Sequence, residues 1–161
     1  MSDPRPEFFA TPAELRSWFE ANHDRRDVLM LGYHRKATGR PSVTWPESVD
    51  VALCFGWIDG VRRSLDEERY VIRFTPRRKG SHWSARNIER MTALIEAGQA
   101  TEAGLAAWRK RTAKRSRRSS FEQGDVALTD AFQARFEAHG GAWDWFAAQS
   151  PYYRRTATWW V

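Results

Sequence analysis

The chain has 161 residues, of which 42% are hydrophobic and 29% charged, and this suits a single domain with one core, predicted over residues 1–161. The formal net charge of +6 and the sequence pI of about 10.0 favour acidic partners such as nucleic acid, phosphorylated small molecules or an anionic surface. One cysteine excludes an internal disulfide and a cysteine-based zinc site, and no apolar run is long enough to span a bilayer, so we expect a cytoplasmic protein with no membrane span.

The first part of the chain predicts a helix followed by a strand. Thr11 can cap a helix, with Pro12 in its first turn and Glu14 completing a capping box. Residues 28–36 predict the strand, and its apolar start, VLML, indicates a central strand that is buried on both faces.

The middle of the chain predicts a second helix and a hairpin. Thr44 and Glu47 repeat the capping-box spacing at the start of this helix, and Gly60 is its predicted stop. The residues that follow predict two strands, 61–65 and 69–75, joined by an acidic turn. In the second strand, even-numbered residues are expected to face one side of the sheet and odd-numbered residues the other.

The C-terminal half predicts four helices. Ser84 and Thr101 can start the first two, residues 129–141 contain the third, and the last begins with Ser150 as its cap. No stop signal follows before Val161, so this C-terminal helix looks truncated. The elements together predict an α+β fold: a small, mostly antiparallel sheet with helices packed on one face and a helical C-terminal half.

A strongly basic run, RKRTAKRSRR, covers residues 109–118 and contains no acid. It is either a solvated loop or frayed helix end, or an arm that contacts phosphate groups. In the second case the chain would bind nucleic acid through the basic residues Arg109, Lys110, Arg111, Lys114, Arg115, Arg117 and Arg118. No known signature of nucleic-acid recognition occurs in the sequence.

The stretch FTPRRKGSHWSARN, residues 74–87, joins the predicted hairpin to the next predicted helix. Free backbone N–H groups at a helix start carry partial positive charge, and arginine and hydroxyl side chains surround this one. The indole of Trp83 could also supply a flat surface for a base or sugar. Together, these groups have the composition of an anion-binding site. The residues predicted to line it are Asp59, Arg73, Arg77, Ser81, Trp83, Ser84 and Asn87.

The same residues also have structural interpretations. Ser84 can be only a helix cap, Trp83 can staple the helix to the core, and the arginines can face water. Asp59, predicted at the C-terminal end of a helix, is disfavoured there by the helix dipole, so a nearby arginine should offset its charge. It is either half of an Asp–Arg bridge between helix and hairpin, or an acid that anchors a ligand.

The sequence contains no motif of a known catalytic or metal site. The four histidines lack the spacing of a metal site, and no phosphate-binding loop, dinucleotide fingerprint or nucleophile elbow occurs. We therefore predict no metal and no cofactor and assign no catalytic residue. A hydrolase would require Asp59, His82 and Ser84 to meet in space.

Two stretches, ALCFGWIDG (52–60) and RFTPRRKGSHWSARNIERMTALIEAG (73–98), resemble the signature of a bacterial family, the YdeI/OmpD-associated or bacteriocin-protection proteins. The tail PYYRRTATWWV resembles the opening of that family's C-terminal segment, so the resemblance covers most of residues 11–161. It implies a cytoplasmic protein of stress and bacteriocin tolerance with no assigned reaction. From the residues themselves, we expect it to bind an anionic small molecule or acidic partner without catalysing a reaction.

Overall fold

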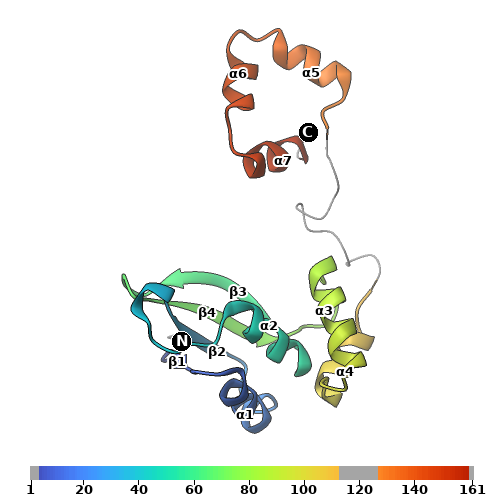
Figure 1. Ribbon diagram of the computed structural model, residues 1–161. Coiled ribbons are helices and arrows are strands. Elements are labelled where there is room, and N and C mark those ends of the chain that lie inside the picture. Colours follow the sequence, from blue (N-terminus) through green and yellow to red (C-terminus); the bar gives the residue numbers. More distant parts are fainter. Residues whose placement is uncertain (1–3, 113–126, 160–161) are drawn as a thin grey trace. The chain divides into compact units, whose positions relative to one another are not determined.

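The computed structural model describes residues 4–112 and 127–159 of the chain (Figure 1). The chain divides into two compact units, which we call the sheet unit (Met1–Ser81 and Arg86–Thr112) and the helical unit (His82–Ala85 and Ala113–Val161). A compact unit need not fold by itself, so the single domain over residues 1–161 stays a prediction. None of the helices within the described ranges has the length and apolar character that crossing a bilayer requires.

A four-stranded sheet lies at the centre of the sheet unit, with the strand order β1-β2-β4-β3. The strands are β1 (Glu7–Phe8), β2 (Leu29–His34), β3 (Trp57–Ser64) and β4 (Arg69–Pro76). Only β1 and β2 run parallel, so the prediction of a mostly antiparallel sheet with a central strand in residues 28–36 is confirmed. The short β1 is not predicted, because two residues are too few for an alternating pattern to be recognised.

Seven α-helices and one 3-10 helix accompany the sheet in the described residues, and this confirms the α+β class with a helical C-terminal half. They are α1 (Pro12–Asn22), the 3-10 helix η1 (Lys36–Thr38), α2 (Trp45–Cys54), α3 (Ala85–Glu96), α4 (Glu102–Arg109), α5 (Asp130–Glu137), α6 (Ala142–Ala147) and α7 (Pro151–Trp159). The short η1 and α6 are absent from the sequence prediction.

The main core lies between one face of the sheet and the helices α1 and α2, as predicted. Alternate side chains of β2 and β4 point to this face, and the apolar sides of both helices pack against them. The core residues are Leu15, Phe19, Leu29, Leu31, Tyr33, Val43, Val51, Ala52, Cys54, Phe55, Trp57, Ile72 and Phe74. Each large apolar side chain that is fully buried contributes about 1.5–3 kcal/mol to folding.

The predicted helix caps of α1 and α2 are present, with one difference, whereas the cap that Ser84 was expected to form stays a prediction. Thr44 and Glu47 form the complete capping box of α2, in which Glu47 accepts hydrogen bonds from the backbone N–H and the hydroxyl of Thr44. The Thr11 hydroxyl caps α1 by accepting from the N–H of Glu14. The Glu14 carboxylate, however, accepts from the N–H of Ala10, so this second capping box closes one residue earlier than predicted.

The predicted stop of α2 at Gly60 is wrong. The helix ends at Cys54, and Gly56 leaves it with a φ of +74°, a left-handed conformation that suits glycine. A Cβ atom at Gly56 would lie 2.9 Å from the carbonyl oxygen of Ala103, so the approach of α4 also requires a glycine here. Asp59 therefore lies inside β3, and the helix-dipole argument for its charge does not apply.

The predicted hairpin is confirmed, although β3 starts four residues earlier than expected. Ile72 and Phe74 of β4 belong to the core, and Tyr70 packs against it, so even-numbered residues face the helices. Val71 and Arg73 line a groove on the other face of the sheet. The alternation along β4 thus follows the predicted pattern.

The described part of the helical unit contains the three short helices α5, α6 and α7 (Figure 1). Phe136 of α5 meets Trp143 and Phe146 of α6, with ring centroids 6.0 and 5.2 Å apart. The hydroxyl of Ser150 accepts from the N–H of Tyr153, which confirms the predicted cap of α7. Aromatic contacts are therefore the main packing interactions of this unit in the described residues.

Candidate functional site

A cleft of about 300 Å³ opens in the sheet unit where β3 and β4 meet the start of α2. Trp45 is the first residue of α2, and the other lining residues come from the two strands. The cleft is lined by Trp45, Asp59, Gly60, Arg62, Tyr70 and Ile72. One acidic and one basic side chain therefore share a space with two aromatic walls.

A β-bulge in β3 brings Asp59 and Arg62 to the same face of the sheet. In a regular strand, residues three positions apart would point to opposite faces. Here Asp59 pairs with Phe74 and Arg62 with Ile72, so three steps along β3 correspond to two along β4. The extra residue turns Arg62 toward the cleft, while Arg63 lines the groove on the opposite face.

The carboxylate of Asp59 uses only part of its hydrogen-bonding capacity. Its Oδ2 atom accepts a hydrogen bond of 3.0 Å from the indole N–H of Trp45. The side chain is half-buried, and Asp59 forms no ion pair with any residue that the structure describes. The carboxylate can therefore accept a further hydrogen bond from a donor in the cleft.

Stacked rings hold the tyrosine wall of the cleft in place. Cζ of Arg62 lies 3.8 Å from the ring centroid of Tyr70, in a cation–π contact. The Tyr70 ring stacks on Tyr33, with centroids 4.7 Å apart and planes inclined by 5°. The Tyr33 hydroxyl shares a 2.6 Å hydrogen bond with the buried Ser48, and burial raises the pKa of Tyr33 above its ordinary value. The wall is thus anchored in the core.

Two more arginines add positive charge around Asp59. The guanidinium of Arg77 is buried, and the loss of water lowers its pKa to about 10, whereas the Asp59 carboxylate acts in the opposite direction. Cζ of Arg86 lies 5.9 Å from the ring centroid of Trp45. Arginine charge therefore exceeds carboxylate charge around the cleft, which favours an anionic group.

Two parts of the chain match different protein families. Residues 7–107 match the family described as Domain of unknown function (DUF8412). The chain belongs to this family. Residues 125–161 match a second family, described as Bacteriocin-protection, YdeI or OmpD-Associated. No curated protein and no solved structure matches the chain.

The second match confirms the predicted YdeI/OmpD-associated family for the tail PYYRRTATWWV. The two stretches that also carried this resemblance, 52–60 and 73–98, lie within the DUF8412 match. The expectation that the resemblance covers most of residues 11–161 is therefore too wide, because the match to that family is limited to residues 125–161. The cleft around Asp59 belongs to the DUF8412 region.

The sheet separates residues of the DUF8412 region that we expected to form one site. Asp59 lines the cleft, and Arg77 is close enough to respond to its charge. Arg73 instead lines a groove of about 420 Å³ on the opposite face, together with Arg63 and Thr75. Because side chains alternate along β4, Arg73 lies on the wrong side of the sheet to join Asp59.

The other predicted site residues lie around the start of α3. Trp83 is 2% exposed, so its ring has no face open to a base or sugar, and the predicted floor of the site is not available. Trp83 and Ser84 belong to the helical unit, and Ser81 and Asn87 to the sheet unit. A ligand site formed by Ser81, Ser84 and Asn87 stays a prediction.

Three residues of the cleft, Trp45, Arg62 and Tyr70, are absent from the predicted set. The sequence does contain a signal for Trp45, because it directly follows the cap Thr44, outside the apolar side of the helix. In the structure it is 40% exposed. Tyr70 could have been found from its alternation with Ile72. Arg62 gives no such signal, because its direction depends on the bulge.

Two features that bear on catalytic chemistry can be examined in the described residues, a metal cluster and a reactive thiol. No group of three or more His, Cys, Asp or Glu residues within them is arranged to hold a metal ion. Cys54 is buried, and burial raises the pKa of its thiol, which disfavours the thiolate that a nucleophile needs. Asp59 belongs to the sheet unit, while His82 and Ser84 belong to the helical unit, so a hydrolase built from them stays a prediction.

The structure describes only the start of the basic run. Arg109 forms a 2.6 Å ion pair with Glu102, and Cζ of Arg111 lies 3.5 Å from the ring centroid of Trp108. Four of its basic residues lie outside the described residues: Lys114, Arg115, Arg117 and Arg118. Nucleic-acid binding through this run, including Lys110, stays a prediction.

Proposed function

We propose that the chain binds a small anionic molecule, carrying a planar ring and a hydrogen-bond donor, in the cleft around Asp59. One observation carries the proposal: Asp59 and Arg62 line the same cleft, and neither forms an ion pair with the other or with another described residue. Opposite charges that are held apart in a cleft can pair with complementary groups of one ligand.

Each part of the ligand follows from one side of the cleft. The guanidinium of Arg62 can donate to a phosphate or carboxylate in charge-assisted hydrogen bonds. The Oδ1 atom of Asp59 can accept from an N–H or O–H group, since Trp45 already donates to Oδ2. The exposed indole of Trp45 offers a flat apolar surface for a ring.

The size of the cleft limits the ligand. Its volume of about 300 Å³ is at the lower end of the range of small-molecule pockets, about 300–1,000 Å³. A compact molecule can be largely enclosed, whereas a polymer would leave most of its surface in water. Binding should accordingly weaken only moderately with salt, in contrast to the steep dependence of a nucleic-acid interface.

Four probes separate the contributions of charge, ring and donor: adenosine monophosphate, phenyl phosphate, adenosine and inorganic phosphate. Adenosine monophosphate should bind tightest, because it alone combines the three features. Binding is measured by calorimetry and by the NMR signal of the Trp45 indole N–H, which should shift on titration. Equal affinity for all four probes would contradict the proposal.

The neighbouring arginines of β3 provide a matched pair of variants. Arg62→Gln should lower the affinity for adenosine monophosphate by about tenfold or more, because it removes a charge-assisted hydrogen bond. Arg63→Gln makes the same chemical change on the opposite face of the sheet and should leave the affinity unchanged. Equal losses in both variants would show that only overall charge attracts the anion.

The role of Asp59 is tested with Asp59→Asn, which keeps the shape of the side chain. This variant should lower the affinity for adenosine monophosphate, whose amino group donates a hydrogen bond. It should leave the affinity for phenyl phosphate unchanged, because that ligand lacks the donor. If both ligands lose affinity equally, Asp59 acts through the structure of the cleft and not through a donor on the ligand.

The match of residues 125–161 to a bacteriocin-protection family supports a cellular setting for this binding. We infer that the ligand serves tolerance of a bacteriocin or a related stress. Cells lacking the protein should regain tolerance with the wild-type chain but not with Arg62→Gln. Full rescue by Arg62→Gln would separate tolerance from the cleft.

A further inference from the structure

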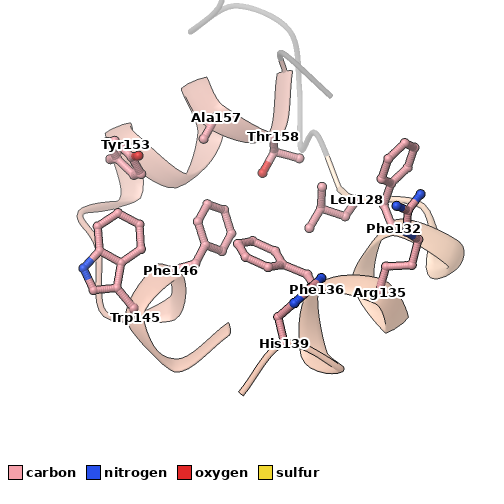
Figure 2. A pocket seen from close by; sticks show the side chains of 10 residues that line it. All are labelled: Leu128, Phe132, Arg135, Phe136, His139, Trp145, Phe146, Tyr153, Ala157 and Thr158. Carbon is pink, nitrogen blue, oxygen red and sulfur yellow. The ribbon is translucent and has the colours of Figure 1, made fainter. Parts of the chain in front are cut away.

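The helical unit contains a second cavity, independent of the cleft around Asp59. It measures about 370 Å³ and is lined by side chains from α5, α6 and α7 and from the residues next to them. Figure 2 shows Phe136 and Phe146 reaching into the space between the helices, with Trp145 and Tyr153 along its edge. The cavity is therefore large enough for a small molecule and mostly aromatic.

The aromatic lining is only partly covered. Among the side chains described between residues 127 and 158, Phe146 alone is buried. Phe132, Trp145 and Tyr153 line the cavity and are exposed, Trp145 by 56%. Exposed aromatic rings around a hollow are typical of a surface that binds an apolar group.

The polar groups of the described lining include one permanent cation. Arg135 and His139 line the cavity, and no acidic side chain does among the residues that the structure describes. The guanidinium of Arg135 makes no hydrogen bond or ion pair with any residue that the structure describes. Glu137 does not line the cavity and accepts a hydrogen bond from Gln133. A ligand in this cavity would meet aromatic surface at its body and an available cation at its edge.

We infer that the cavity binds a small amphiphilic carboxylate, with its apolar body between Phe136, Phe146 and Trp145 and its carboxylate at Arg135. The imidazole of His139 also lines the cavity and supplies a second hydrogen-bonding group. The apolar body would cover aromatic surface that water now meets, and the carboxylate would pair with the guanidinium in charge-assisted hydrogen bonds.

The head group is tested on the full chain with three ligands that share one alkyl chain: octanoate, octanol and octylammonium. Calorimetry and the NMR signals of the Trp145 and Phe146 region report binding. Octanoate should bind about tenfold tighter than octanol, and octylammonium weakest, because only the carboxylate gains the arginine contact. Octanol binding as tightly as octanoate would overturn the inference.

Two arginines of the helical unit give a matched pair. Arg135→Gln should reduce octanoate affinity to that of octanol, a loss of about tenfold, and should leave octanol unaffected. Arg154→Gln changes an exposed arginine that does not line the cavity and should have no effect. Equal losses in the two variants would overturn the carboxylate contact.

A third variant tests the location. Ala157 lines the cavity from α7, and Ala157→Leu should fill part of it and weaken octanoate and octanol alike, with unchanged circular dichroism. Unchanged binding in this variant would overturn the placement of the ligand. Because none of these variants changes a residue that lines the cleft around Asp59, binding of adenosine monophosphate serves as a control throughout.

Discussion

Phe19, Trp57 and Phe74 of the sheet unit are fully enclosed, whereas Phe132 and Trp145 of the helical unit are exposed. The sheet unit joins segments that are distant in sequence, so its aromatic rings can be covered from several sides. The helices α5, α6 and α7 have 8, 6 and 9 residues, and helices of this length are marginal without tertiary packing. Stability thus resides mainly in the sheet unit, and open aromatic surface in the helical unit.

The largest expected effect comes from one phenylalanine in each unit. Phe74→Ala should lower the free energy of unfolding of the sheet unit by about 3–5 kcal/mol, because Phe74 is 0% exposed in the core. Phe146→Ala, at a site that is 8% exposed, should disrupt the helical unit and leave the sheet unit as stable as before. Urea unfolding followed by NMR signals of each unit measures both.

The same experiment tests the single-domain expectation. If Phe146→Ala lowers the urea midpoint of the sheet unit as much as that of the helical unit, residues 1–161 unfold as one cooperative domain. The contrast drawn between the units would then fail.

A smaller effect is expected from a pair of glycines. A Cβ atom at Gly104 would lie 2.3 Å from the carbonyl oxygen of Cys54, so Gly104→Ala must push α4 away from α2 and should cost about 1–3 kcal/mol. At Gly140, in the helical unit, a Cβ would meet no atom within 4 Å, and Gly140→Ala should change stability by less than about 0.5 kcal/mol. Thermal unfolding that is equal in both variants would contradict this view of α4 packing.

The smallest effect is expected from two helix caps. Thr44→Ala removes the capping box of α2 and should cost about 1 kcal/mol. Thr129→Ala removes the corresponding cap of α5 and should change only the helical unit. Urea unfolding at pH 7 compares them.

The pH dependence of stability gives a further control on the contribution of the α2 cap. Hydrogen bonds from Thr44 lower the pKa of Glu47 below its ordinary value of 4.5. Since the folded-state pKa is the lower one, the stabilisation is present above pH 4.5 and lost as the pH falls through the lowered pKa. The cost of Thr44→Ala should therefore shrink in acid, and a constant cost would show that the carboxylate contributes nothing.

Features that depend on neighbours in the sequence were predictable. The caps Thr11 and Thr44 act within one helical turn, and the alternation of β4 is a property of a single strand. The end of α2 was not, because Gly56 and Gly60 are both compatible with a stop. The choice between them depends on the close approach of Ala103, a contact between distant segments.

The candidate site shows the same division. Asp59 was predicted as a site residue, but at the C-terminal end of a helix. It lies in β3 instead, and its neighbours differ accordingly. Arg62 was missed because a bulge reverses its direction, and nothing in a run of two arginines shows which one faces the helices. Arg73 was misplaced because charge composition carries no information on the two faces of a sheet.

The adjacent arginines at the bulge have a consequence for mutation by insertion or deletion. Losing one residue at Gly60 or Val61 would only remove the bulge and leave Arg62 opposite Ile72, whereas gaining one residue there, with the bulge kept, would exchange the faces of Arg62 and Arg63. As both positions carry the same side chain, each side of the sheet would retain a guanidinium after the exchange. A length change that would ordinarily invert the chemistry of a strand is therefore nearly conservative in charge at this point.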